Sequence, residues 1–136
     1  MEESLIEKPE DLNALTLAYI GDAVFELEVR KHMMLTGSQK VEKLHKHVTA
    51  FVNAKSQSDL IKILEPQLTE TENLVYHRGR NSKTVTAAKH QTITDYRRAT
   101  GFEAVFGYLY LKGDRARLEE LLDICFGTLG ETVVDS

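Results

Sequence analysis

Residues 15–27 read LTLAYIGDAVFEL, and this stretch decides the fold class. Its apolar side chains occur on all sides of a helix, which is typical of a helix at the centre of a protein. They are Leu15, Leu17, Ala18, Tyr19, Ile20, Ala23, Val24, Phe25 and Leu27. Asp22 nevertheless lies among them, and Glu26 follows one turn later. A buried, unpaired carboxylate is costly, so Asp22 is expected to be paired, protonated or bound to a metal ion.

A second helix repeats this pattern. Within residues 102–111 every side chain is apolar, glycine or tyrosine except Glu103. Each helix also contains a glycine, Gly21 beside Asp22 and Gly107 one turn after Glu103. A glycine costs roughly 1 kcal/mol in a helix interior, and close approach of two helices is a good reason to accept that cost. The pattern therefore predicts that the two helices cross and bring Asp22 and Glu103 together.

Two facing carboxylates have a chemical use and a structural alternative. Their hard oxygen atoms suit Mg²⁺ or Mn²⁺, and such an ion can activate water and neutralise a phosphodiester during hydrolysis. The alternative is a buried salt bridge to an arginine or lysine from another helix. Glu26 shares a face with Asp22, so it is either a third ligand or an exposed, ion-paired carboxylate.

The remaining hydrophobic periodicity is also helical, and no segment alternates as a strand does, so we expect an all-α protein. The first helix is predicted over about residues 12–35, with Asp11 as its N-cap and Gly37 at its end. Residues 79–93 lack a hydrophobic stripe and are predicted to form a basic loop. The other expected caps are the Thr69–Glu72 capping box, Thr94 before a helix over about 95–111, Gly113 at its end, and Asp114 before the last helix.

Length and composition narrow the class of protein. A chain of 136 residues is expected to form a single domain over 1–136, with an acidic N-terminal tail over about 1–10. Its one cysteine, Cys125, excludes an internal disulfide framework and is predicted to be a small buried apolar residue. No run approaches about 18 uncharged apolar residues, and the acidic start is unlike a signal peptide. We therefore expect a soluble intracellular protein.

The formal net charge is −4, but the basic residues are concentrated in two segments. Residues 28–55 contain six basic and two acidic side chains, and residues 77–98 contain six basic and one acidic. Phosphate binding depends on local positive potential rather than on net charge, so both segments are candidates for nucleic-acid contact. The alternative is that they are ordinary solvated helix faces.

Several motifs together resemble one known family. Residues 17–26, LAYIGDAVFE, resemble the signature helix of ribonuclease III endonuclease domains, and residues 100–111, TGFEAVFGYLYL, resemble the second catalytic helix. Between them, FVNAK at 51–55 and RGRNSK at 78–83 resemble one branch, Mini-ribonuclease III, in which the catalytic domain stands alone. The resemblance covers about residues 12–122. It implies a helical bundle like that of the ribonuclease III endonuclease domain.

The resemblance is incomplete at the site. Larger members of the family have four acidic residues per site, of which Asp22 and Glu103 match two. Ala18 and Thr100 stand where the other two would be, and Mini-ribonuclease III proteins are similar to this chain there. The resemblance thus implies that Asp22 and Glu103 are both catalytic and metal-binding. Mg²⁺ bound by two protein ligands would keep several waters, which it tolerates well.

What the resemblance implies is a homodimeric, Mg²⁺-dependent endoribonuclease that cuts double-stranded RNA, with one site per subunit. Mn²⁺ is expected to substitute for Mg²⁺. The implied substrate is the precursor of 23S ribosomal RNA, trimmed at its 5′ and 3′ ends at a paired stem. The implied location is the bacterial cytoplasm, away from membranes. Whether a ribosomal protein assists is left open.

The basic segments supply candidate RNA contacts. A-form RNA is gripped mainly through phosphates and 2′-hydroxyls, with little reading of bases. The residues expected to clamp a duplex beside Glu103 are Arg78, Arg80, Lys83, Lys89, Arg97 and Lys55. The alternative function is a non-catalytic ribonuclease III-like dimer that binds structured RNA. Carboxylates in apolar helices beside glycines favour the enzyme, because a protein that only binds RNA has no use for them.

Overall fold

The computed structural model describes residues 6–37, 40–82 and 92–134, with side chains described as far as Thr128. These residues contain α-helices and two short 3₁₀ turns and no strand, which confirms the all-α prediction. The helices are α1 (Ala14–Thr36), α2 (Val41–Phe51), α3 (Ala54–Leu64), α4 (Glu70–Arg80), α5 (Ile93–Lys112) and α6 (Arg115–Val134), and the 3₁₀ turns are η1 (Pro9–Asp11) and η2 (Glu65–Gln67).

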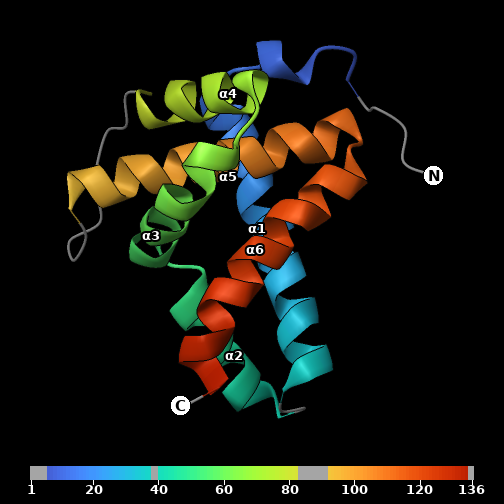
Figure 1. Ribbon diagram of the computed structural model, residues 1–136, viewed down its shortest axis with the longest axis vertical. Coiled ribbons are helices and arrows are strands. Elements are labelled where there is room, and N and C mark those ends of the chain that lie inside the picture. Colours follow the sequence, from blue (N-terminus) through green and yellow to red (C-terminus); the bar gives the residue numbers. More distant parts are fainter. Residues whose placement is uncertain (1–5, 38–39, 83–91, 135–136) are drawn as a thin grey trace.

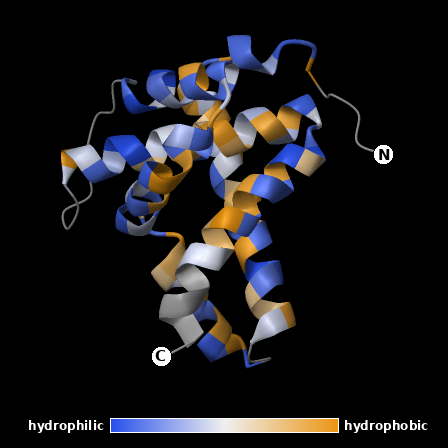
Figure 2. Cartoon of the chain, in the orientation of Figure 1, coloured by the Kyte–Doolittle hydropathy of each residue, from blue (hydrophilic) through white to orange (hydrophobic). Residues whose placement is uncertain are grey.

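Helix α5 is the centre of the fold. It crosses α1 and also packs against α3 and α4, as Figure 1 shows. Its side chains are buried without a break from Ala104 to Leu109. Figure 2 shows more orange, hydrophobic segments in the half of α5 that leads to α6 than in the opposite half. The charged residues Asp95, Arg97 and Arg98 belong to that opposite half. Glu103 therefore lies where the polar half of this central helix meets its apolar half.

Helix α1 begins later than the sequence pattern predicted. Its N-cap is Asn13, whose Oδ1 accepts hydrogen bonds from the backbone N–H of Leu15 at 2.8 Å and of Thr16 at 3.4 Å. The predicted cap, Asp11, is wrong because it lies in the 3₁₀ turn η1, and Leu12 between them has extended backbone. The predicted end is confirmed, since α1 ends at Thr36, directly before Gly37.

The basic segment is more helical than predicted. Helix α4 continues through Gly79 and Arg80, so the loop prediction for 79–93 is wrong at its start. It is also wrong at its end, because α5 begins at Ile93 with Thr92, not Thr94, as its cap. The Thr92 hydroxyl accepts from the backbone N–H of Asp95 at 3.0 Å. Residues 83–91 lie outside the described residues.

The other predicted caps are confirmed. The Thr69 hydroxyl accepts from the Glu72 backbone at 3.2 Å, and the Glu72 carboxylate accepts from the Thr69 backbone at 2.9 Å. Gly113 ends α5 in the left-handed conformation, with φ of 78°. The Asp114 carboxylate accepts from the Arg117 backbone at 3.1 Å at the start of α6. Cys125 is fully buried, and burial raises the pKa of its thiol to about 12.

Two arginines at the start of α6 hold this helix to the rest of the protein. Arg115 donates two hydrogen bonds to Glu28 of α1, at 3.0 and 3.1 Å. Arg117 donates two to Glu72 of α4, both at 2.9 Å. Burial alone would raise the pKa of both carboxyls, but these hydrogen bonds and charges outweigh it, and the pKa of each lies below its ordinary value.

No helix in the described part of the chain combines the length and the apolar character that crossing a lipid bilayer requires.

Candidate active site

The crossing of α1 and α5 brings two backbones into direct contact. A Cβ atom at Gly21 would lie 1.7 Å from the carbonyl oxygen of Glu103, and one at Gly107 would lie 2.0 Å from that of Leu17. No side chain fits at either position, which is why both are glycine. The predicted close approach is confirmed, and it places Asp22, the next residue after Gly21, beside Glu103.

An aromatic cluster beneath this crossing fixes the angle of the two helices. Phe25 of α1 meets Phe102 edge-to-face with ring centroids 4.8 Å apart, and it meets Phe106 at 5.3 Å. All three rings are fully buried. Phe25 is three residues after Asp22 and Phe102 precedes Glu103, so packing of these rings sets the positions of both carboxyl-bearing residues.

The two carboxyls lie in different surroundings. Asp22 is exposed, which corrects the expectation that it is buried, because α1 is covered on only part of its circumference. Glu103 is half-buried. Burial raises the pKa of Glu103 to about 9, and Asp22 adds to this by hydrogen bonding and by its charge. Metal-free protein at neutral pH therefore holds Glu103 protonated beside Asp22.

The alternative of a salt bridge does not apply at this crossing. Among the described residues, the ion pairs include none to Asp22 or Glu103, and no cation contributes to the pKa of Glu103. Glu26 pairs with Arg30 one turn along α1 instead of joining Asp22. The described residues contain no group of three or more acidic, histidine or cysteine side chains that could hold a metal. The donor set is thus two carboxyls, which fits a hard divalent cation that keeps several waters.

The candidate RNA contacts fall into two groups. Arg78 is engaged within the fold, because its guanidinium donates to the carbonyl of Glu10 and, at 2.6 Å, to that of Leu12. Arg80 lies over the Tyr76 ring at 5.8 Å, and Arg97 is exposed on α5.

The other three candidates are lysines, of which the structure describes Lys55 alone. Lys55 is exposed and pairs with Asp59 at 3.1 Å. A hydrogen-bonding contribution from Ser58 and the charges of Lys55 and Lys62 lower the pKa of Asp95 in the first turn of α5. Lys55 is therefore on the same side of the protein as the start of that helix. Lys83 and Lys89 lie outside the described residues.

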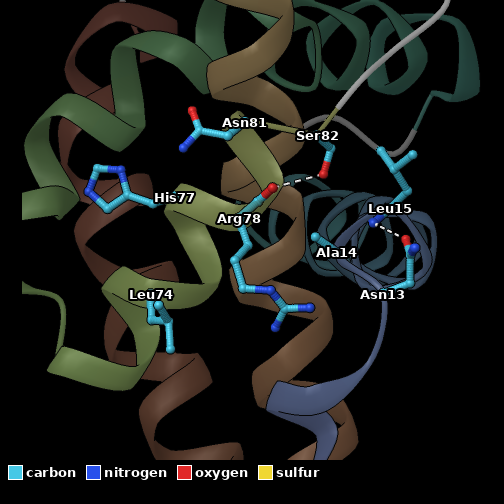
Figure 3. A pocket seen from close by; sticks show the side chains of 8 residues that line it. All are labelled: Asn13, Ala14, Leu15, Leu74, His77, Arg78, Asn81 and Ser82. Carbon is cyan, nitrogen blue, oxygen red and sulfur yellow. Dashed lines mark hydrogen bonds between the residues drawn. The ribbon is translucent and has the colours of Figure 1, made fainter.

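A separate hollow lies between α4 and the start of α1, shown in Figure 3. Asn13, Ala14 and Leu15 line one side of it, and Leu74, His77, Arg78, Asn81 and Ser82 line the other. The Ser82 hydroxyl donates to the Arg78 carbonyl at 2.8 Å and extends the end of α4. Neither carboxyl of the candidate site lines this hollow.

Comparisons with known proteins agree with this geometry. The family model described as the Ribonuclease III domain matches residues 15–114, which include both carboxyl-bearing helices. The chain belongs to the ribonuclease III family.

Relatives and a solved structure support this membership. The chain is 45% identical to Mini-ribonuclease 3 of Enterococcus faecalis, over 89% of this chain and 93% of that protein. It is 44% identical to Mini-ribonuclease 3 of Streptococcus pneumoniae, over 84% and 91% respectively. A crystal structure of a Fusobacterium nucleatum protein is 34% identical, with a TM-score of 0.79, and the match covers 87% of this chain and 94% of that one. This ribonuclease III-family protein is an endoribonuclease.

The structure shows what occupies the two positions at which the family resemblance implied acids, Ala18 and Thr100. Ala18 and Thr100 are both buried, with exposures of 6% and 7%. The Thr100 hydroxyl donates to the Tyr96 carbonyl at 3.0 Å, so it is used within α5. The chain fills these positions with small side chains that need no counter-charge.

One polar residue of the site was missed by sequence reasoning. Gln57 of α3 is 2% exposed, and its amide is close enough to Glu103 to lower the pKa of that carboxyl. The sequence pattern does indicate this residue. Gln57 lies three, four and seven residues before Leu60, Ile61 and Leu64, and so shares their apolar stripe on the helix. Like Asp22 and Glu103, Gln57 is a polar side chain within an apolar helix face.

Proposed function

We propose that this protein is a divalent-metal-dependent endoribonuclease that cleaves double-stranded RNA, with Asp22 and Glu103 as its metal ligands. The supporting observation is the α1–α5 crossing, where backbone contact at Gly21 and Gly107 forces two carboxyls together without a cation from the chain. Such a pair costs stability, and a bound divalent cation offsets that cost.

The chemistry of the site follows from these groups. Asp22 and Glu103 would hold Mg²⁺, with Mn²⁺ as a substitute, and the bound ion would supply activation of a water molecule and neutralise charge on the scissile phosphate. Glu103 would have to give up its proton to serve as a ligand. The Phe25–Phe102 contact keeps both carboxyls in place, and exposed Asp22 leaves one side of the site open to RNA.

The exposed face of α1 supports a homodimer. Leu15, Tyr19, Ala23 and Leu27 recur every four residues and lie on one face. Tyr19 is 83% exposed and Leu27 is 64% exposed, although both are large and apolar. We propose that a second copy covers this face, so that two sites address the two strands of a duplex. Tyr19→Lys should then yield a monomer in analytical ultracentrifugation.

RNA contact is proposed for Arg80, Arg97 and Lys55, together with Lys83 and Lys89. The names of the relatives support a role in bacterial RNA processing. We propose the ends of precursor 23S ribosomal RNA as the cytoplasmic substrate, with a ribosomal protein as a partner left open. A stem from that precursor should be cut at fixed positions, whereas an unrelated duplex of equal length should give scattered products.

Incubation of the purified protein with long double-stranded RNA tests the main proposal. Cleavage is expected with Mg²⁺, and none with a chelator or with Asp22→Asn, while single-stranded RNA of the same length is cut far less. Retention of duplex RNA in a gel-shift assay without any Mg²⁺-dependent cleavage would instead establish the non-catalytic RNA-binding dimer.

A further inference from the structure

A buried amide beside the two carboxyls lacks a partner. Gln57 lies near the start of α3 and is 2% exposed. Its Nε2 has no hydrogen-bond partner among the residues that the structure describes. An unsatisfied buried donor costs about 1–3 kcal/mol, so an apolar side chain of the same size would be favoured if packing were its only role.

The amide faces Glu103. The two side chains interact, although they form no hydrogen bond of ordinary geometry. A buried donor without an ordinary partner therefore lies beside a half-buried carboxyl that can accept from it.

We propose that Gln57 is a positioning residue, whose Nε2 donates a hydrogen bond to one carboxylate oxygen of Glu103 while the other oxygen binds the divalent cation. The inference rests on the proposed function, because it takes Glu103 to be a metal ligand. A carboxylate has more acceptor sites than one ion occupies, and ligands of bound metals are held in orientation by such neighbouring donors.

The difference in exposure explains why Glu103 needs this donor and Asp22 does not. Water can hydrogen-bond the free oxygen of exposed Asp22. Glu103 is half-buried between α5 and its neighbours, so the protein itself has to supply the donor. Gln57 comes from α3, which packs directly on α5, and its side chain is buried there.

The test compares the full-length protein with Gln57→Met, which keeps the unbranched shape and removes the amide. Mn²⁺ affinity, measured by electron paramagnetic resonance without RNA, is expected to fall about 10- to 100-fold, as it does when a donor to a metal ligand is lost. The melting temperature of the metal-free protein is expected to stay equal or rise, because an unsatisfied donor is removed. With duplex RNA at saturating Mg²⁺, kcat is expected to fall while KM for RNA changes little.

Ser58→Ala is the matched control. Ser58 is the next residue of α3 and is fully buried, and its Oγ also lacks a partner of ordinary geometry. Ser58 interacts with Asp95 in the first turn of α5 and not with Glu103. The Ser58→Ala variant should leave Mn²⁺ affinity unchanged. Gln57→Leu, which lacks the amide but has a different shape, should weaken Mn²⁺ binding as much as Gln57→Met does.

Three results would overturn the proposal. They are unchanged Mn²⁺ affinity in Gln57→Met, a loss of affinity that appears only together with a lower melting temperature, and a raised KM for RNA with kcat intact. If the wild-type protein cuts no duplex RNA, the proposed function fails, whereas the Mn²⁺ affinities still decide the role of Gln57.

Discussion

Two carboxyls, Glu28 and Glu72, pair with arginines at the start of α6, whereas the carboxyls at the α1–α5 crossing have no basic partner among the described residues. Glu28 and Glu72 are buried, and Arg115 and Arg117 each meet one of them with two hydrogen bonds. Glu103 is half-buried, and the charged group that acts on its pKa is another acid, Asp22. The pKa of Glu72 is therefore lowered, whereas the pKa of Glu103 is raised to about 9.

The difference separates carboxyls that stabilise the fold from carboxyls kept for an external cation. At α6 the counter-charge is part of the chain, so folding alone satisfies Glu28 and Glu72. At the crossing the described part of the chain provides no counter-charge, so Glu103 is kept protonated until a metal ion supplies one. Removing a carboxyl that pairs with an arginine of α6 should therefore lower stability and spare RNA cleavage. Removing a carboxyl at the crossing should abolish cleavage and spare stability.

The largest effect is expected for Glu103→Gln. Cleavage of duplex RNA should fall by more than about 100-fold, which exceeds the usual cost of losing a group that merely orients a metal ligand. The metal-free protein should melt at the same temperature or higher, since glutamine does not have to take up a proton on folding at neutral pH, as Glu103 does. Gel-based cleavage assays and thermal melts on one preparation check both parts. A lower melting temperature would place Glu103 among the structural carboxyls.

Gly21→Ala should act on both properties at once. Its Cβ would lie 1.7 Å from a backbone carbonyl, which no rotamer change can relieve, so we expect a loss of about 3 kcal/mol or more. Gly127→Ala in α6 is the control, because a Cβ there has no atom within 4 Å. It should stabilise the protein by roughly 0.5–1 kcal/mol. Urea denaturation of both variants measures the contrast, and equal effects would contradict the close crossing.

Glu72→Gln should be the converse of Glu103→Gln. Removing one partner of a buried ion pair is expected to cost roughly 3 kcal/mol of the free energy of unfolding. Below the melting temperature, the rate of RNA cleavage should remain close to that of the wild type. Glu119→Gln, which affects an exposed pair with Arg115, should change stability by less than about 1 kcal/mol.

The pH dependence of stability should also differ between the two regions. The pKa of Glu103 is raised from 4.5 in the unfolded chain to about 9, so its stabilising contribution is complete below 4.5 and lost as pH rises through about 9. The lowered pKa of Glu72 gives the reverse, a contribution present at neutral pH and lost on acidification. Without metal, Glu103→Gln should flatten the alkaline side of the melting profile and Glu72→Gln the acidic side.

The smallest effects are expected among the arginines of α4. Arg80→Ala should weaken duplex RNA binding a few-fold and reduce the slope of log affinity against log salt by about 0.9, the value for one lost phosphate contact on B-DNA. Arg78→Ala should instead lower stability by about 1–3 kcal/mol, because it leaves two part-buried backbone carbonyls before α1, those of Glu10 and Leu12, without their donor. An unchanged salt slope in Arg80→Ala would remove that residue from the RNA contacts.

Local sequence predicted the elements best where one residue type controls a helix end. The Thr69–Glu72 capping box, Gly113 and Asp114 were all correct, because each satisfies backbone groups within a few residues of itself. Asp11 and Thr94 were wrong because a second capping residue, Asn13 or Thr92, lies two positions away. Pattern alone does not choose between two competent caps.

The predicted site was correct in its crossing and incomplete in its members. Gly21 and Gly107 are rare enough inside apolar helices that their contact could be inferred from sequence. The exposure of Asp22 could not, because it depends on which faces of α1 the other helices leave uncovered. The helical start of the basic segment was missed for a related reason, because it depends on contact with α5. Gly79 packs on Gly101 of α5, and a Cβ at Gly79 would lie only 2.8 Å from the Gly101 Cα.

The sequence by itself determined that the protein is helical, that two glycine-bearing helices meet, and that Asp22 and Glu103 meet with them. These follow from periodicity and from the cost of glycine and of carboxylates in apolar helices, which are local properties. Only the tertiary structure decided which carboxyls receive an arginine and which do not. Arg115 and Arg117 are more than 40 residues from Glu28 and Glu72, and Gln57 belongs to another helix than Glu103, so packing in three dimensions assigned these partners.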